Sequence, residues 1–201
     1  MTDLLVFLYS FADALQVAAQ NNHLFVAAAG NKGLLNNDLY PTYPASYDNE
    51  NIISVANTTS SDGLYFESHY GLTSVDLGAL GTSIYSTKPN DIYGNLSGTS
   101  MACPHVAGAA ALLLSECNSL SSQEIKDALM NSTTPISALS GKCVTGGRLN
   151  VNAAMQSLTN LICVPDTNCL TNDSLALVAL YNSTDGPNWT NTWDLSQSVS
   201  S

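Results

Sequence analysis

The sequence predicts an α/β fold with a mostly parallel sheet flanked by helices. Two apolar runs of strand length, residues 24–29 and 52–56, are continuous rather than alternating. Continuous runs are typical of strands that are buried on both faces. Segments with helical spacing interleave with these runs, which favours parallel strands joined by helices. Hydrophobic residues make up 45% of the 201 residues, so the chain can bury a core.

The first predicted element is a helix that begins after Ser10, a residue type that caps helices well. A signal peptide is the competing interpretation, because residues 4–11 are apolar and residues 12–14 resemble a cleavage site. No basic residue precedes that run, and Asp3 lies directly before it. We favour the helix because small and apolar residues recur at helical spacing: Phe11, Ala14, Leu15, Ala18 and Ala19.

The remaining strands are predicted from short apolar runs between turn signals. The two buried runs, 24–29 and 52–56, are separated by a loop over 33–48, in which prolines interrupt any regular element. Shorter strands are expected at 75–77 and 84–86.

Three further helices are predicted in the second half of the chain. The longest covers residues 100–115 and is rich in Ala and Leu. Ser121 and Glu124 form a capping box for a helix that ends near residue 130. After a Gly-Gly turn, Asn150 caps a last helix that ends near residue 158.

Composition excludes some functions and indicates a compartment. Sixteen acidic against five basic residues give a net charge of −11, which makes the chain a poor ligand for nucleic acid. No apolar run reaches the roughly 18 residues of a membrane span. Five cysteines imply at least one without an intramolecular partner. A polar, weakly charged surface favours the outside of the cell, and Asn-x-Ser/Thr sequons agree with it: Asn57, Asn95, Asn131, Asn172, Asn182 and Asn188.

The most informative stretch is residues 97–108, Ser-Gly-Thr-Ser-Met-Ala-Cys-Pro-His-Val-Ala-Gly. Gly98 allows a sharp turn, and Ser100 stands in the first turn of an Ala-rich helix. The N–H groups and dipole of a helix start favour negative charge nearby. An ordinary capping serine is the alternative. A nucleophile elbow of the α/β-hydrolase type would need Gly where the chain has Ala102.

This stretch resembles the nucleophile motif of the subtilisin-like serine peptidases, the subtilase or S8 family. Further segments resemble the same family in the same order: residues 26–33, 43–47 with 52–56, and 146–151. The resemblance covers roughly residues 5–160. It implies a partial subtilisin-like α/β fold, the C-terminal half of a catalytic domain, and a serine endopeptidase that acts on proteins or peptides through an acyl-enzyme.

The resemblance also implies roles for single residues. Ser100 is the nucleophile, and Asn31 supplies the side-chain donor of the oxyanion hole, with the Ser100 N–H as the second donor. Ala28, Ala29 and Gly30 form one wall of the substrate pocket. Lys32 lies near its rim, where we hypothesise that it accommodates acidic substrate side chains. His105 belongs to the same helix as Ser100, which makes it unsuitable as the general base.

The family's Asp and His do not occur in matching segments of this sequence. In the family both lie upstream, one in an Asp-Ser/Thr-Gly segment and one in His-Gly-Thr-His. The triad needs all three groups, so we expect this chain to be a fragment that is inactive alone. The alternative is an inactive peptidase-like scaffold that acts as an extracellular binding module. No cofactor or metal is expected, although the carbonyls of residues 43–47 resemble a loop that holds a weak structural cation in some members.

The chain is expected to divide into three parts. Residues 1–160 form the half peptidase domain and 161–172 a linker. Residues 173–201 resemble the cap that opens a leucine-rich repeat array, because an apolar helix precedes a Trp-bearing turn. A repeat region would provide a surface for a protein partner. Together these features predict an extracellular or secretory-pathway protein that neither binds nucleic acid nor spans a membrane.

Overall fold

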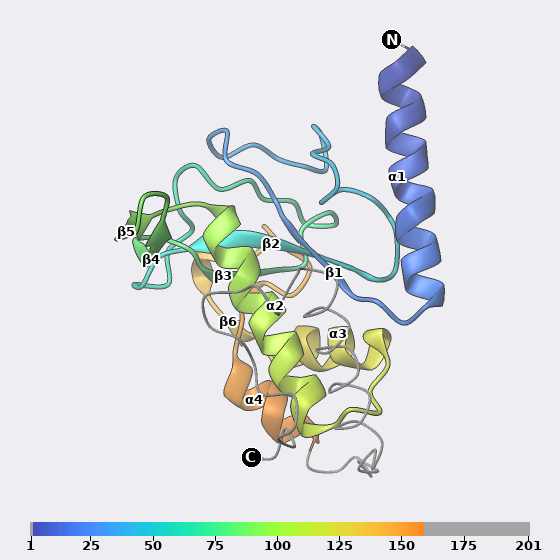
Figure 1. Ribbon diagram of the computed structural model, residues 1–201. Coiled ribbons are helices and arrows are strands. Elements are labelled where there is room, and N and C mark those ends of the chain that lie inside the picture. The colour runs from blue at the N-terminus through green and yellow to red at the C-terminus, as the bar shows by residue number, and fades with distance from the viewer. Residues whose placement is uncertain (1, 159–201) are drawn as a thin grey trace.

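The computed structural model describes residues 2–158 of the chain, with side chains from residue 10 onward (Figure 1). The expected linker over 161–172 and the expected repeat cap over 173–201 lie outside the described residues. The described part corresponds to the half peptidase domain predicted over 1–160.

A five-stranded sheet, β1 (Phe25–Ala28), β2 (Ile52–Thr58), β3 (Leu77–Leu80), β7 (Gly147–Arg148) and β6 (Thr134–Pro135), runs in that order. The first four strands are parallel, and only the short β6 runs antiparallel to its neighbour within this sheet. Every residue of β2 is buried, as expected for a central strand of a parallel sheet. The predicted α/β fold with a mostly parallel sheet is therefore confirmed.

Helices cover the sheet and enclose the main core. Helix α2 (Thr99–Glu116) crosses the sheet and contacts β1, β2 and β3, while α3 (Ser122–Asn131) and α4 (Val151–Ser157) pack beside it (Figure 1). The largest fully buried side chains of this core come from β2, β3, α2 and α3: Ile53, Leu77, Val106, Leu113 and Leu129. No helix in the described part of the chain is long and apolar enough to cross a membrane.

Helix α1 (Thr2–Gln20) stands beside the β1 end of the sheet (Figure 1). Leu15 packs in a separate cluster with Ala27 and Ile52. The buried Asn51 side chain ties the end of the helix to the sheet, because its Nδ2 donates to the Leu15 carbonyl at 3.2 Å and to the His23 carbonyl at 2.9 Å. The predicted helix is confirmed, but Ser10 lies inside it. The apolar run before Ser10 contains no helix-breaking residue, so the helix extends back to Thr2.

The starts of the three later helices, α2, α3 and α4, were predicted more accurately than the strand ends. Ser121 forms a capping box with Glu124, and the Asn150 side chain accepts from the Ala153 N–H, as expected. The strand expected at 75–77 begins two residues later, as β3. The strand expected at 84–86 is β4 (Ile84–Lys88), and it pairs with β5 (Ile92–Leu96) in an antiparallel hairpin apart from the main sheet.

Candidate active site

Ser100 stands exposed in the first turn of α2. The helix begins after Gly98, and the N–H groups of Met101 and Ala102 both donate to the Gly98 carbonyl. The Ser100 N–H donates to no group among the described residues. Since the first N–H groups of a helix have no intrahelical acceptor, this one can serve a ligand placed beside the Ser100 hydroxyl.

Asn31 lies in the loop that follows β1, and its side chain is held by the start of α2. Asn31 Oδ1 accepts from the Thr99 N–H at 2.8 Å and from the Thr99 hydroxyl at 3.2 Å. The Thr99 hydroxyl accepts in turn from the Gly30 N–H at 3.2 Å. Because two donors hold the amide oxygen, the Nδ2 group is the end of the amide that remains for a ligand. Asn31 is thus bonded to Thr99, the residue directly before Ser100.

Gly98 permits this close approach. A Cβ atom at this position would lie 3.3 Å from Asn31 Oδ1 and 3.5 Å from Nδ2, and the backbone has φ +156°. A larger residue would press against the amide that Thr99 holds.

The expected substrate wall lies at the carboxyl end of β1, next to Asn31. Ala28 and Gly30 are half-buried, whereas Ala29 is 0% exposed and packs in a core cluster with Ala56 and Val75. The backbone of Ala29 is buried as well, because its N–H donates to the Val55 carbonyl and its carbonyl accepts from Asn37 Nδ2. Lys32 is exposed.

A buried His69 lies directly behind this segment, and sequence reasoning assigned it no functional role. Its Nε2 accepts from the Lys32 N–H at 3.0 Å, and its Nδ1 lies 2.9 Å from Asn37 Oδ1. Burial lowers the pKa of His69, and the charge of Lys32 lowers it further, so the neutral ring is favoured. His69 is therefore a buried core histidine.

The other histidines do not serve Ser100. His105 is exposed, and its Nδ1 bonds the Met101 carbonyl of its own helix at 2.8 Å. His23 is exposed near the end of α1. Within residues 10–158, no histidine or aspartate is hydrogen-bonded to Ser100. The described part of the chain therefore holds a candidate nucleophile without a general base.

The cysteine nearest to Ser100 in sequence is not a second nucleophile. Cys103 donates its thiol proton to the Val26 carbonyl at 3.3 Å, and burial raises the pKa of this thiol. A protonated, half-buried thiol is a poor nucleophile at neutral pH.

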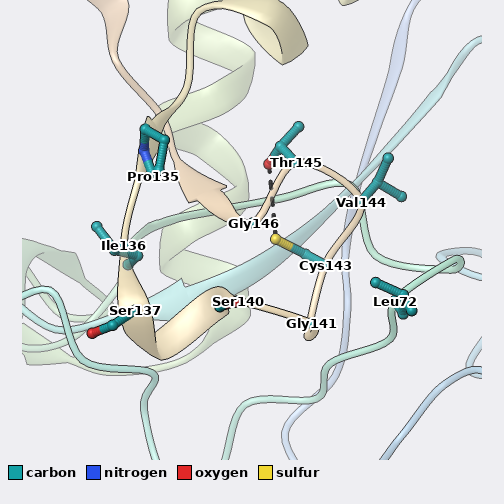
Figure 2. Close-up of a pocket in the computed structure, with 10 residues that line it drawn as sticks. All are labelled: Leu72, Pro135, Ile136, Ser137, Ser140, Gly141, Cys143, Val144, Thr145 and Gly146. Atoms are coloured by element: carbon teal, nitrogen blue, oxygen red, sulfur yellow. Dashed lines mark hydrogen bonds between the residues drawn. The ribbon is translucent and has the colours of Figure 1, made fainter.

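Of two surface hollows, one is lined by Ser100 and the other lies away from the candidate site. One, of about 240 Å³, is lined by Ser100 together with Ile84, Met101 and Pro104, between the β4–β5 hairpin and α2. The other, of about 450 Å³, lies in the loop around residues 135–146 and includes none of the candidate site residues (Figure 2). At its base the Cys143 sulfur lies 3.8 Å from the Thr145 hydroxyl.

The loop at 43–47, whose carbonyls were expected to suit a weak cation, borders a hollow that contains the ammonium group of Lys126 from α3. Lys126 Nζ donates to the carbonyls of Glu50 and Ile52 at 3.0 and 2.6 Å, in a hollow that is also lined by Ala45, Tyr47 and Asp76. In the described part of the chain, no group of three or more His, Cys, Asp or Glu side chains is arranged to hold a metal ion.

Ser100 thus stands at the start of helix α2, and Asn31, whose Nδ2 has no acceptor among the described residues, is held by the adjacent Thr99. Comparisons with known proteins show the family to which the chain belongs. The model of the subtilase family matches residues 8–160. Thermitase of Thermoactinomyces vulgaris is 43% identical over 143 residues, which cover 71% of this chain and 48% of thermitase. Subtilisin DY of Bacillus licheniformis is 39% identical over 145 residues, 71% of this chain and 50% of that protein. The chain belongs to the subtilase family, a family of serine peptidases.

A solved structure supports the same assignment. The prenylagaramide maturation protease PagA superposes with a TM-score of 0.64 and is 32% identical, covering 73% of this chain and 55% of PagA. The chain spans about half the length of the curated relatives that it matches.

Proposed function

We propose that this chain supplies the nucleophile and the oxyanion-binding groups of a serine endopeptidase that cleaves proteins or peptides. The observation that carries the proposal is the pair of hydrogen bonds that Thr99 donates to Asn31 Oδ1. They hold the Asn31 amide beside the start of α2, with Nδ2 and the Ser100 N–H both available as donors. Donors that are fixed before the reaction need no reorganisation when the oxyanion forms.

In this mechanism the Ser100 Oγ attacks the carbonyl carbon of the scissile peptide bond. A general base takes the hydroxyl proton and returns it to the leaving amine, and an acyl-enzyme ester remains on Ser100. Water then attacks the ester carbonyl carbon. The base takes a proton from this water and returns it to the Ser100 Oγ, which is released as the ester bond breaks. Asn31 Nδ2 and the Ser100 N–H bind the negative oxygen of each tetrahedral intermediate.

The base and its carboxylate partner belong, in our proposal, to an upstream segment outside the described residues. The family pattern places both before the first segment that this sequence matches. The chain alone is expected to be inactive, since a serine hydroxyl without a base is a weak nucleophile.

The test is a fusion of the upstream part of thermitase, which this chain does not match, to the full 201-residue chain. We expect the fusion to hydrolyse a peptide substrate and to react with a fluorophosphonate at Ser100. Ser100→Ala abolishes both, whereas Ser115→Ala, a matched change near the far end of the same helix, leaves both unchanged. Asn31→Leu lowers kcat by about 10²–10³, the loss measured in subtilisin when one oxyanion donor is removed.

Two results would contradict the proposal. Hydrolysis that survives Ser100→Ala would show that another group is the nucleophile. A folded fusion that neither hydrolyses peptides nor reacts with the fluorophosphonate would favour the inactive binding scaffold.

The proposal includes an extracellular or secretory location. It is supported by the weakly charged, Asn-, Ser- and Thr-rich composition. The sequons at Asn95 and Asn131 are exposed, whereas Asn57 is 0% exposed within β2. Expression through a eukaryotic secretory pathway should therefore give glycosidase-sensitive mass at Asn95 or Asn131 and none at Asn57, as measured by peptide mass spectrometry. A folded product with glycan on Asn57 would count against this arrangement.

A further inference from the structure

His69 binds the backbone on both sides of Asn31. Its Nε2 accepts from the Lys32 N–H at 3.0 Å, and its own backbone N–H donates to the Gly30 carbonyl at 2.9 Å. The residue is 2% exposed, so water does not compete for these bonds. One buried residue therefore fixes the peptide groups that come directly before and after the oxyanion-hole candidate.

A buried asparagine, Asn37, accepts from the His69 ring and extends the contact to Ala29. Because Nε2 accepts from Lys32, the neutral ring carries its proton on Nδ1. Nδ1 donates to Asn37 Oδ1 at 2.9 Å, with the Thr42 hydroxyl a second acceptor at 3.2 Å. Asn37 is 1% exposed, and its Nδ2 donates to the Ala29 carbonyl at 2.9 Å. Residues 29, 30 and 32 are thus all held by the His69–Asn37 pair.

Close packing adds a steric constraint. A Cβ atom on Gly30 would lie 2.4 Å from His69 Nδ1 and 2.6 Å from Cε1, and the backbone there has φ +124°. Only glycine allows this approach and tolerates this conformation. The imidazole therefore occupies a fixed place against the backbone of the residue before Asn31.

We propose that His69 is a positioning residue for the oxyanion-binding amide, acting through the backbone of residues 29–32 without touching the substrate. The inference rests on the proposed role of Asn31. Thr99 holds the amide from the side of α2, and the His69–Asn37 pair holds the backbone from behind. Hydrogen-bond strength depends steeply on donor position, so an amide fixed at one end alone would lose much of its effect on the transition state.

The ring performs this role in its neutral form. A proton on Nε2 would place an N–H group against the Lys32 N–H and remove the acceptor. The neighbouring Lys32 charge and the burial of the ring both oppose that proton.

The kinetic test uses the fusion of the upstream part of thermitase to the full chain. His69→Leu removes both ring bonds, and we expect kcat to fall about 10–100-fold with KM changed less than about threefold, a loss below that for removing the donor itself. His69→Gln can offer Oε1 to the Lys32 N–H and should recover part of kcat. Leu129→Ala is the matched control, since it weakens the core of α3 far from Asn31 and should lower the melting temperature with kcat unchanged.

A second readout does not depend on catalysis. In ¹⁵N-labelled fusion protein carrying Ser100→Ala, NMR should show His69 protonated at Nδ1 and the Lys32 N–H protected from exchange. His69→Leu should abolish that protection and shift the resonances of the Asn31 side-chain amide. His23→Gln, at an exposed histidine, should leave them in place.

These readouts separate the inference from the function on which it rests. The inference is overturned if His69→Leu leaves kcat at the level of Leu129→Ala, or leaves the Asn31 amide resonances unchanged. If the fusion shows no hydrolysis that depends on Ser100, the proposed function fails. In that case the Asn31 resonances still decide whether His69 positions the amide.

Discussion

Thr99 connects the helix that carries Ser100 to the loop that carries Asn31. Its N–H and hydroxyl both donate to Asn31 Oδ1, and its hydroxyl accepts from the Gly30 N–H. The side chain is 0% exposed. A single buried hydroxyl thus satisfies one backbone donor and helps to orient one side-chain amide, so its removal should affect stability and catalysis together.

Thr99→Val keeps the shape of the side chain and removes the hydroxyl. The Gly30 N–H then loses its acceptor in a partly buried site, which should cost about 1–3 kcal/mol of unfolding free energy. We expect kcat of the fusion enzyme to fall about tenfold, because Asn31 keeps one of its two donors. Chemical denaturation and peptide hydrolysis measure the two effects. Thr133→Val, whose hydroxyl makes one long 3.4 Å bond, is the control and should change neither by much.

Lys32 offers a test of substrate preference. The side chain is exposed next to Asn31, at the rim of the expected pocket. A cation there should favour acidic substrate residues by roughly 0.5–1 kcal/mol, as for an exposed ion pair. Lys32→Met should therefore reduce the kcat/KM ratio of a Glu peptide to a Phe peptide a few-fold, more at low salt than at high salt. An unchanged ratio would remove Lys32 from the account of specificity.

The site residues differ in how visible they are in the sequence. Ser100 and Asn31 stand in contiguous segments that resemble family motifs, one at a helix start and one in the turn after a strand. His69 has no such signal. It lies 37 residues from Lys32, and its other partners are the Gly30 carbonyl, Asn37 and the Thr42 hydroxyl, so no spacing or residue type marks it. Its role depends on where the loops fold back.

The loop between β1 and β2 is fastened to the loop before β3 by one carboxylate. Asp38 accepts from the backbone N–H groups of Leu72 and Ser74 at 2.7 and 2.9 Å and from the hydroxyls of Thr73 and Ser74 at 2.9 and 2.7 Å. Partial burial would raise the pKa of Asp38, but these hydrogen bonds outweigh it and lower the pKa. The ionised form therefore stabilises the folded state.

This carboxylate predicts a pH effect with a defined sign. A lowered pKa in the folded state gives stability above the unfolded value of 3.8, and that stability is lost as pH falls through the folded pKa. Asp38→Ala should cost about 1 kcal/mol at pH 7, after allowance for solvent exposure, and little at low pH. Melting curves of the fusion protein at several pH values measure it. The control is Asp13→Ala, at an exposed aspartate, which should show no such pH dependence of stability. If it does, the effect is not specific to the hydrogen bonds of Asp38.

Lys126 sets a positive charge close to the loop at 43–47, whose carbonyls were expected to hold a weak cation. Its ammonium group bonds the Glu50 and Ile52 carbonyls near Asp76, whose pKa burial raises. Lys126→Met would leave those carbonyls and a buried carboxylate without a positive charge. We expect the variant to lose about 1–3 kcal/mol and to regain part of it in millimolar Ca²⁺, whereas the parent responds little. A parent that Ca²⁺ stabilises as strongly would show that Lys126 does not replace the ion.

The sheet as a whole ends at β1, and this has a consequence for the isolated chain. Only β2 pairs with β1 in the described part of the structure, and at its other edge the Val26 carbonyl accepts from the Cys103 thiol. Parallel strands are normally covered on both sides, and an open edge invites association. We expect the 201-residue chain alone to aggregate or to lack a cooperative melt, and the thermitase fusion to be monomeric. Light scattering and calorimetry distinguish the two; a soluble, cooperative monomer of the chain alone would contradict the expectation.

The central strands of the sheet were predicted better from the sequence than the short strands at its edge and in the hairpin. The runs at 24–29 and 52–56 became β1 and β2, because a strand buried on both faces must be apolar throughout. The hairpin partner β5 and the two-residue strands β6 and β7 were not predicted. Every residue of β5 except the half-buried Gly94 is exposed, and the short pair is set by its neighbours rather than by its own pattern.

Local chemistry in the sequence determined the starts of α2, α3 and α4 and the two buried strands, since each depends on residues that are close together in the chain. The serine motif and the Asn-bearing turn lie far apart in the chain, and only their resemblance to the family linked them. Tertiary structure alone decided that Thr99 holds Asn31, that His69 and Asn37 support the backbone around it, and that Lys126 fills the carbonyl cluster. These contacts join segments from 8 to 76 residues apart. Hydrogen bonds between distant segments form only where the packed core brings them together, and no local pattern encodes that placement.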